Sequence, residues 1–477
     1  MSSSQWLPIK DLAAKVSAGE LKAADLVERA LKTIEEKKEF DAILATTAER
    51  ARERAASIDS SVQNGQKVGR LAGVPFIAKD NYLVFGAETT AASNILKGFY
   101  APYQATVIER LEVEGAIVVA KANLDAFAHG GSTENSDFMT TKNPRDKTRV
   151  SGGSSGGSTA AVMLDMAPFA LGSDTGGSIR QPASFCGAIG YKPTYGATSR
   201  YGVIAMASST DVMGPITRTV EDASLVWDVI AGRDPFDGTT IERDPDGYID
   251  LPTDIKGKRI GVIKEHMGDG VEPGVKAATQ AAVEKLKAAG AEVQEISLPS
   301  LPLGLAVYYI LVPAELSSNL SRHDGQRYQF SAPDAKDLDD SYMQSRGLGF
   351  GKEAKRRIMI GTHVLSSGYY DAYYRKAQIV RTKIINDFNE AFNKVDFLVG
   401  PVAPMTAFKI GENAGDPLKM YLADLMTVPA SLAGIPAISI PAGEDEKGLP
   451  VGLHIMAPQR ADRALLGFSK GAEELLK

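Results

Sequence analysis

Short apolar segments that do not alternate with polar residues recur along the chain, and amphipathic segments with helical spacing separate them. A strand that is apolar throughout must be buried on both faces, as in a sheet covered by helices on both sides. This pattern predicts an α/β protein with one central sheet between layers of helices. The strand candidates are Val74–Ala78, Ala116–Ala120, Pro168–Leu171, Arg259–Ile263, Phe397–Val399, Ala437–Ile440 and Val451–Ile455.

Three segments have the residue pattern of helices. Apolar residues recur at helical spacing among charges in Ile9–Lys38, and Leu44–Ile58 is rich in Ala, Arg and Glu. Gly274–Ala289 lies between two strand candidates and is followed by Gly290, as a crossover helix would be. We therefore expect a helical segment before the first strands and a crossover helix in the second half.

Two stretches have the composition of long surface loops. Arg233–Pro252 is rich in Asp, Pro and Gly, and Ser331–Gly351 is polar. Neither is long enough to separate independent domains. We therefore expect one domain over residues 1–477, in which a helical segment, residues 1–65, packs on an α/β core, residues 66–477.

Charge and cysteine content exclude several classes of protein. A net charge of −6 and a pI near 5.6 argue against nucleic acid binding to this chain's own surface, because phosphates are bound by clusters of Lys and Arg. The one cysteine, Cys186, excludes internal disulfides and fits a reducing compartment. Met1–Trp6 lacks the start of a signal peptide, and charges or prolines interrupt the most apolar segments, Ala160–Gly172 and Val428–Gly443. We expect a cytoplasmic protein with no membrane partner.

Two turns rich in glycine and serine, Gly152–Ser158 and Asp174–Ser178, flank an apolar segment. Alone, Ser151–Ser158 has the composition of a flexible linker. The segment that follows, Thr159–Leu164, is suited to burial, which favours a turn whose backbone lies close to other groups. A phosphate-binding loop is not expected, because the Gly-Lys-Ser/Thr ending is missing.

A serine hydrolase with a histidine base is one alternative. Gly152–Gly156 matches the G-x-S-x-G pattern, and His129-Gly130-Gly131 is similar to the start of a lipase oxyanion motif. The residues before the serine, Asn143–Arg149, are typical of a loop, whereas that fold requires a strand there. A base for this alternative would have to be one of four downstream histidines, His266, His323, His363 and His454.

Lys79 ends an apolar strand candidate, and ligand sites of α/β sheets gather at strand ends. A lysine can activate a serine if its amine is neutral. Lowering its pKa from about 10.4 to about 7–8 costs the charged form roughly 3–5 kcal/mol, which burial can supply. The alternative is an ordinary ion pair between Lys79 and Asp80. The residues alone do not decide between the two.

Three motifs, in their order and spacing, resemble the amidase signature family over nearly the whole chain: Gly73–Asn81, Ser151–Ser158 and Gly172–Ala183. The resemblance implies one α/β/α domain with a mixed central sheet. It also implies a catalytic set in which Ser178 is the acyl-forming nucleophile, Ser154 is a relay serine beside a cis peptide bond, and Lys79 is the base.

An oxyanion hole follows from the same resemblance. Thr175, Gly176 and Gly177 precede the serine nucleophile and would offer successive main-chain N–H groups to the tetrahedral intermediate. Loss of one such donor typically raises the barrier by about 3 kcal/mol.

Within the family, the chain most resembles the glutaminase subunits of tRNA-dependent amidotransferases. This implies that Arg357 binds the carboxylate of glutamine, that Asp424 binds its ammonium group, and that Tyr308 or Tyr309 closes the site. On composition alone, Arg357 and Asp424 would be surface charges. The segments behind the narrower resemblance are Tyr195–Gly202, Gly368–Tyr374 and Leu425–Ala430.

Several residues depart from the family pattern. Ala126 stands where an acid is usual, and His129 and Gly131 replace a usual Met and Ser. Thr210–Val212 also differs from the usual Leu-Asp-Gln. All but the last are expected near the substrate pocket. The differences leave the hydrolytic residues in place and concern the shape of the pocket and its communication with a partner. We expect His129 and Cys186 to be packing residues.

The resemblance implies a glutaminase subunit of a heterotrimer with B-type and small C-type subunits. Ammonia from glutamine would serve the ATP-dependent conversion of Glu-tRNA(Gln) to Gln-tRNA(Gln), with Asp-tRNA(Asn) as another acceptor. No cofactor or metal is expected in this chain, since ATP and Mg²⁺ would be used by the partner, which would also hold most of the tRNA. The alternatives are a stand-alone amidase acting on another small carboxamide and a purely structural subunit.

Overall fold

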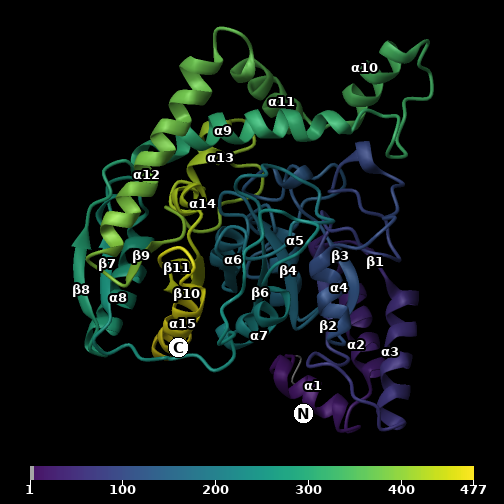
Figure 1. Cartoon of the computed structure of the whole chain (residues 1–477), viewed down its shortest axis with the longest axis horizontal. Helices are drawn as coiled ribbons and strands as arrows, with labels where there is room; N and C mark the ends of the chain where they lie inside the picture. Colours follow the sequence, from purple (N-terminus) through teal and green to yellow (C-terminus); the bar gives the residue numbers. More distant parts are fainter. Residues whose placement is uncertain (1–4) are drawn as a thin grey trace.

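A mixed sheet of eleven strands runs through the part of the chain that the structure, a computed structural model, describes, residues 5–477 (Figure 1). The strand order is β1-β3-β2-β4-β6-β5-β10-β11-β9-β7-β8. Strands β3, β2 and β4 are parallel, as are β9, β7 and β8, and the remaining pairs are antiparallel. The predicted α/β class with a mixed sheet is confirmed. The strands are β1 (Ile43–Thr46), β2 (Pro75–Lys79), β3 (Ile117–Ala122), β4 (Phe169–Asp174), β5 (Ile189–Lys192), β6 (Val212–Thr217), β7 (Arg259–Ile263), β8 (Glu292–Ile296), β9 (Phe397–Pro401), β10 (Ala437–Glu444) and β11 (Pro450–Met456).

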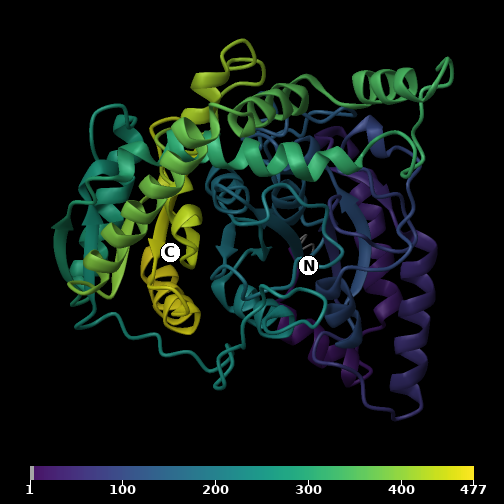
Figure 2. The same ribbon diagram turned by 45° about the horizontal axis from the view of Figure 1, so that its top comes forward.

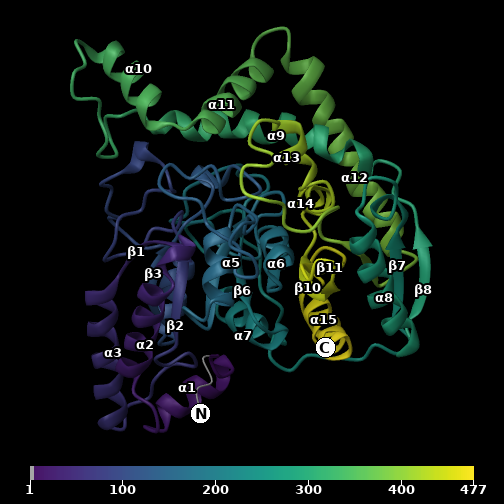
Figure 3. The same cartoon turned by 180° about the vertical axis from the view of Figure 1, so that it is seen from behind.

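Helices pack against the sheet in two groups. Helices α5 and α6 contact each other and the central strands, whereas α4, α7, α15 and α8 contact one another in series and pack on strands from β3 to β11. Helices α1, α2 and α3 lie at the end of the sheet opposite β7 and β8 (Figures 1 and 3). The α-helices are α1 (Ile9–Ser17), α2 (Ala23–Glu36), α3 (Ala48–Gln63), α4 (Thr106–Val113), α5 (Gly156–Met163), α6 (Arg180–Cys186), α7 (Val220–Ile230), α8 (Pro273–Ala288), α9 (Gly304–Asn319), α10 (Leu338–Gly349), α11 (Lys352–Leu365), α12 (Lys376–Phe392), α13 (Pro417–Leu422), α14 (Val428–Ala433) and α15 (Asp462–Leu476).

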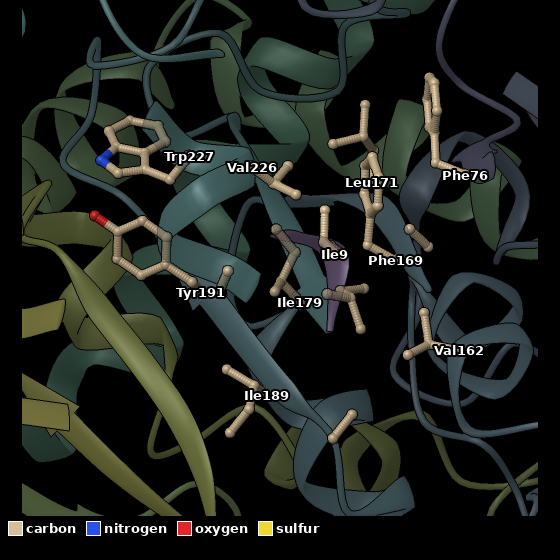
Figure 4. Packing of buried hydrophobic residues seen from close by; sticks show 14 of the residues in the cluster. Ile9, Phe76, Val162, Phe169, Leu171, Ile179, Ile189, Tyr191, Val226 and Trp227 are labelled. Atoms are coloured by element: carbon tan, nitrogen blue, oxygen red, sulfur yellow. The ribbon is translucent and has the colours of Figure 1, made fainter. Parts of the chain in front are cut away.

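Aromatic packing in the core fixes the register of the strands that carry the site. Phe76 of β2 pairs with Phe169 of β4, and their rings stack with centroids 5.1 Å apart. Tyr191 and Trp227 meet edge to face at 5.4 Å in the same core (Figure 4). Burying each such side chain contributes about 1.5–3 kcal/mol. Because a one-residue slip would turn these rings to the opposite face of the sheet and break their packing, the packing holds the end of β2 beside the end of β4.

An arm of helices runs across the top of the molecule in the view of Figure 1, from the side of β7 and β8 toward the side of β1. Helix α9 packs against α11, α12 and α14, and α10 lies at the outer end of the arm (Figure 2). The segment Leu301–Arg322, which contains α9, is long and apolar enough for a membrane span by length and composition, with half of its most apolar window buried. Sequence reasoning missed this segment. Its packing on three helices is that of a core helix.

Most predicted elements match the structure, and two expectations were wrong in part. Ser331–Gly351 was expected to be a loop, but it contains α10. Leu44–Ile58 was expected to be helical, but its first residues belong to β1, which pairs with β3 at the sheet edge. The N-terminal segment therefore also contributes a strand to the sheet. The division of the chain at residue 65 stays a prediction, and the expectation about a signal peptide concerns residues 1–4 in part, which lie outside the described residues.

Candidate active site

Lys79 is the last residue of β2, and its amine lies among serines. Its Nζ is 2.8 Å from Ser154 Oγ, 2.9 Å from Ser155 Oγ and 3.0 Å from Ser173 Oγ. The alternative ion pair with Asp80 is wrong, since the carboxylate of Asp80 lies 2.6 Å from the amine of Lys121 instead. Lys79 is therefore placed to exchange protons with hydroxyl groups.

Burial changes the protonation of this lysine. Lys79 is fully buried, and desolvation lowers its pKa to about 7, although the carboxylates of Asp125, Asp174 and Asp211 favour the charged form. A substantial fraction of the amine is then neutral near neutral pH. A neutral amine can accept a proton from a serine hydroxyl.

The loop that carries Ser154 is buried throughout, so the linker interpretation of Ser151–Ser158 is wrong. The Gly153–Ser154 peptide bond is cis, as the family resemblance implies. The main-chain N–H of Gly153 donates to Gln181 Oε1 at 2.9 Å, and Gln181 Nε2 donates to the carbonyl of Gly131 at 2.8 Å. Gln181 thus ties the serine loop to a second loop. Sequence reasoning missed it, because the two contacts join segments far apart in the chain.

Asp125 lies against the same loop. A Cβ added to Gly153 would be 2.1 Å from Asp125 Oδ2, so only glycine leaves room for this carboxyl group. Its oxygens accept from the main-chain N–H groups of Thr133, at 2.9 Å, and Asn135, at 3.1 Å, while burial raises the pKa of Asp125 to about 7. Asp125 is a second residue that sequence reasoning missed.

Ser178 follows β4 and precedes α6, with 8% of its surface exposed. Its carbonyl accepts from the main-chain N–H of Ser155 at 3.0 Å, which places the two serine segments side by side. Within residues 5–477, the Ser178 hydroxyl forms no hydrogen bond with another residue. The structure therefore brings Lys79 and Ser154 into contact and gives the hydroxyl of Ser178 no partner in the described part of the chain.

The residues before Ser178 form a loop with open main-chain donors. In the described part of the chain, the N–H groups of Thr175, Gly176 and Gly177 donate to no other residue. The hydroxyl of Thr427 donates to the carbonyl of Gly176 at 2.6 Å, so the loop is fixed through its carbonyl side. Gly177 has φ +148°, and a Cβ there would be 2.2 Å from Thr427 Oγ1. The arrangement leaves three N–H groups free to bind an oxyanion.

A buried ion pair anchors this loop to α6. Arg180 Nη2 lies 2.9 Å from Asp174 Oδ1, and both side chains are fully buried. Burial raises the pKa of Asp174, but the Arg180 guanidinium, together with Lys192 and the main-chain N–H of Ile179, leaves that pKa below its usual value. Arg180 Nη1 also donates to the carbonyl of Thr427 at 3.0 Å. The pair thus connects the end of β4 to Thr427, the residue whose hydroxyl bonds to the carbonyl of Gly176.

A cavity of about 130 Å³ contains the predicted substrate-binding charges. Arg357, Asp424 and Tyr309 line it, together with Gly131 and Tyr421. Tyr309 donates to Asp424 Oδ2 over 3.4 Å, and burial raises the pKa of this carboxyl group to about 7. Arg357 and Asp424 thus face the same small space, which Arg356, Glu134 and Glu353 also line.

Arg357 is buried, with 2% of its surface exposed, so the surface interpretation of this residue is wrong. Its Nε donates to Glu353 Oε1 at 2.8 Å, and its guanidinium lies over the rings of Tyr309 and Tyr421 at 5.1 and 5.5 Å. Tyr421 also donates to Glu353 Oε1 at 2.9 Å. Glu353, which sequence reasoning missed, therefore holds Arg357 in place. In the sequence, Glu353 has the spacing of a charge on a solvated helix face, so nothing there indicated that it contacts a buried arginine.

The two neighbouring tyrosines have different surroundings. Tyr309 lines the cavity with Arg357 and Asp424. Tyr308 is buried, and a Cβ added to Gly176 would be 2.7 Å from its ring and hydroxyl. Tyr309 thus faces the charged cavity, whereas Tyr308 covers the loop with the free N–H groups.

Of the residues that depart from the family pattern, Gly131 lines this cavity, and Ala126 and His129 line a pocket that shares Glu353 with it. A Cβ on Gly131 would be 3.5 Å from Asp424 Oδ1, an ordinary contact. Ala126 and His129 are buried, and His129 stacks on Phe127 with ring centroids 6.2 Å apart. Burial lowers the pKa of His129 well below its usual value, and neither ring nitrogen has a hydrogen-bond partner among the described residues.

Two further expectations concern cysteine and histidine. Cys186 is buried, its thiol donates to the carbonyl of Ser151 at 3.3 Å, and burial raises the pKa of the thiol. Across residues 5–477, no histidine side chain hydrogen-bonds to a serine of Ser151–Ser158. His454 instead lies 3.0 Å from Arg180. The geometry therefore offers Lys79, and no histidine, as the base for Ser154.

Comparison with known proteins gives consistent matches over the full chain. The Amidase family model matches residues 25–466. The A subunit of glutamyl-tRNA(Gln) amidotransferase from Caldanaerobacter subterraneus subsp. tengcongensis is 51% identical over 99% of this chain and 96% of its own. The crystal structure of the corresponding A subunit from Thermotoga maritima has a TM-score of 0.82 and 39% identity, covering 99% of this chain and 96% of that one. The structure of a peptide amidase from Stenotrophomonas maltophilia has a TM-score of 0.80 and 27% identity, covering 100% of this chain and 97% of that one.

Proposed function

Because the chain belongs to the amidase family, we propose that it is the glutaminase subunit of a tRNA-dependent amidotransferase. It hydrolyses glutamine to glutamate and ammonia, and a partner uses the ammonia to convert Glu-tRNA(Gln) to Gln-tRNA(Gln). The observation that carries the chemistry is the 2.8 Å contact between the buried amine of Lys79 and the hydroxyl of Ser154. The similarity to the A subunits of such amidotransferases along nearly their whole length supports the choice of reaction.

The proposed reaction begins with proton transfer along a relay. Neutral Lys79 accepts the proton of Ser154, and Ser154 accepts that of Ser178 as its oxygen attacks the carboxamide carbon of glutamine. The hydroxyl of Ser178 must move within reach of Ser154 for this step. Catalytic hydrogen bonds commonly close only when substrate is bound, and the hydroxyl of Ser178 has no other partner to leave within the described residues.

The tetrahedral intermediate then collapses to an acyl-enzyme. The N–H groups of Thr175, Gly176 and Gly177 hold the oxyanion, and they need not break an existing hydrogen bond to do so. The relay returns the proton to the departing nitrogen, which leaves as ammonia. Water attacks the ester of Ser178 with Lys79 and Ser154 as base, and glutamate is released.

Two charges in the cavity would select glutamine among amides. Only the Nε of Arg357 is hydrogen-bonded within the described residues, so its terminal nitrogens remain available for the α-carboxylate of the substrate. Asp424 would pair with the α-ammonium group, which favours the ionised form of a carboxyl group whose pKa burial has raised. Tyr309 borders both groups. The distance from the α-carboxylate and α-ammonium group to the side-chain carboxamide would thus decide which amide fits.

The proposal includes the setting of the reaction. The chain would act in the cytoplasm with B-type and small C-type subunits, and the partner would bind ATP, Mg²⁺ and most of the tRNA. The net charge of −6 supports the last point, because this chain alone offers a poor surface for phosphates. A stand-alone amidase is the second candidate, favoured by the similarity to a peptide amidase structure.

One experiment separates the two functions. Ammonia release is measured with glutamine, asparagine and benzamide, for the full chain alone and for the chain co-expressed with its B- and C-type partners and supplied with charged tRNA. We expect hydrolysis of glutamine in the complex and little with benzamide. Fast turnover of benzamide by the free chain, with no preference for glutamine, would favour the stand-alone amidase and contradict the proposed function.

A further inference from the structure

A second cavity, of about 440 Å³, lies apart from the one that holds Arg357 and Asp424. Its walls come from Gly202–Ala205, from the loop that contains Leu96 and Phe99, and from the segment that follows α9. The two cavities share no lining residue among those described. Its volume is in the range of pockets that bind small organic molecules. Nothing in the proposed hydrolysis uses this space.

Aromatic rings form much of the cavity wall. Phe99 and Tyr328 meet edge to face with centroids 5.5 Å apart. Tyr103 stacks on Tyr201 at 5.0 Å and is 41% exposed. Phe99, Tyr103 and Tyr328 line the cavity, and Tyr201 lies behind Tyr103. Rings placed in this way offer stacking surfaces to a flat aromatic molecule.

The charged groups of the cavity are cations. Arg322 and Arg327 line it, and no Asp or Glu is among its described lining residues. Arg327 Nε lies 3.5 Å from Asp324, a carboxylate outside the lining, and its side chain is 69% exposed. Arg322 donates only a long hydrogen bond, 3.4 Å, to Asn319 within the described chain. The chain as a whole carries a net charge of −6, but the lining of this cavity has two arginines and, among the described residues, no carboxylate. The cavity therefore favours an anionic ligand.

A buried histidine, His323, forms part of the wall. His323 is 6% exposed, and its ring lies 5.2 Å from that of Phe127 and 5.1 Å from that of Tyr328. Its Nδ1 has no hydrogen-bond partner within residues 5–477. Burial, with Arg322 and Arg346 nearby, lowers its pKa to about 4, so the ring is neutral at pH 7. This nitrogen is itself closed off from solvent, so a ligand in the cavity would meet the neutral ring of His323 and not its Nδ1.

We propose that this cavity binds a small molecule with a flat aromatic body and one anionic group, either a carboxylate or a phosphate. The aromatic body stacks among Phe99, Tyr103 and Tyr328. The anion pairs with Arg322 and Arg327 at the rim, and the body also contacts the neutral ring of His323.

The cavity wall is connected to the candidate active site. The N–H of Ile204 donates to the carbonyl of Asn81 at 2.8 Å, and Asn81 Nδ2 donates to Ser173 Oγ at 3.0 Å, the hydroxyl that contacts Lys79. Further along, the N–H of Ala207 donates to Asp211, which accepts from the hydroxyl of Thr175 at 2.7 Å. A ligand that shifts this wall would therefore shift groups that contact Lys79 and Thr175.

The test is calorimetric titration of the full chain with 2-naphthoate and with 2-naphthyl phosphate. Matched controls are 2-naphthalenemethanol, which lacks the anion, and acetate and inorganic phosphate, which lack the rings. We expect at least one of the two aromatic anions to bind at least tenfold more tightly than every control, and the tighter of the two identifies the anionic group. Equal affinity for the neutral analogue, or no binding of either aromatic anion, would overturn the proposal.

Variants assign the binding to this cavity. The double variant R322Q/R327Q should weaken binding at least tenfold, and so should Y328A. R375Q removes another exposed arginine, and R357Q alters the other cavity, so both should bind as the parent chain does. Circular dichroism and thermal unfolding confirm that each variant is folded. Unchanged affinity in folded R322Q/R327Q, or loss of affinity in R357Q, would place the ligand elsewhere and refute the assignment.

Discussion

Lys79 and Asp80 are neighbours in the chain, yet the amine of Lys79 lies among serine hydroxyls while the carboxylate of Asp80 lies 2.6 Å from Lys121. Lys79 is the last residue of β2, whereas Asp80 begins the turn that follows and its carboxylate contacts Lys121 of the neighbouring strand β3. Lys121 neutralises the buried carboxylate. Among the described residues, Lys79 therefore has no ion-pair partner that would keep it charged, and desolvation lowers its pKa.

Replacing Lys79 should affect the rate of catalysis, whereas replacing Lys121 should affect the stability of the fold. Lys79→Met should reduce kcat for glutamine by about 10²–10⁴-fold, the usual contribution of a general base, with little loss of stability. Lys121→Met leaves Asp80 buried without a counter-charge and should lower the free energy of unfolding by about 3–5 kcal/mol. Glutaminase kinetics and chemical denaturation measure the two effects. Normal kcat in Lys79→Met would exclude this residue as the base.

The serines around Lys79 differ in their expected roles. Ser178→Ala should abolish ammonia release, and Ser154→Ala should be nearly as damaging, because residues of one relay are not additive. Ser155→Ala is the matched control: its hydroxyl lies 2.9 Å from the same amine, but it is outside the proposed relay, so kcat should fall by less than about tenfold. If Ser155→Ala were as inactive as Ser154→Ala, the relay would have to be assigned again.

The pH dependence should separate catalysis from binding. Lys79 is active when neutral, so kcat should rise with pH through about 7 and level off above that value. Asp424 binds an ammonium group when ionised, so KM for glutamine should increase as pH falls through about 7. Steady-state kinetics from acid to alkaline pH in the parent chain and in Asp424→Asn check this. The variant should keep the kcat profile and lose the change in KM; a flat kcat profile in the parent would contradict a titrating base.

Two adjacent arginines on α11 test the recognition of glutamine. Arg357→Gln should raise KM by roughly 10–100-fold, since a hydrogen bond to a charged group contributes about 1.5–3 kcal/mol. Arg356→Gln is the control, because Arg356 lines the same cavity and pairs with the same Glu353, but its side chain is 45% exposed. Its KM should stay within about twofold of the parent value, as expected for an exposed ion pair. An equal KM in the two variants would remove Arg357 from the substrate site.

The sequence predicted the buried strands well, because β2, β3 and β4 are apolar over most of their length and end where the chemistry lies. It did not reveal β6, since Gly214 and Pro215 within that strand resemble a turn. It also placed Lys79 at the end of a strand, but not beside Ser155, because that contact depends on how two distant loops fold.

The supporting residues of the site could not be predicted from the sequence for the same reason. Glu353, Gln181 and Asp125 act through partners on other segments or through the space that a glycine leaves, and none of them has a local pattern. Arg357 even has the spacing of an exposed helix residue, although it is almost completely buried.

The chain of contacts from Ile204 through Asn81 to Ser173 has a pharmacological consequence. An inhibitor lodged against Ile204 would disturb the environment of Lys79 without occupying the place of glutamine. Its inhibition would be non-competitive, so raising the glutamine concentration would not restore the rate.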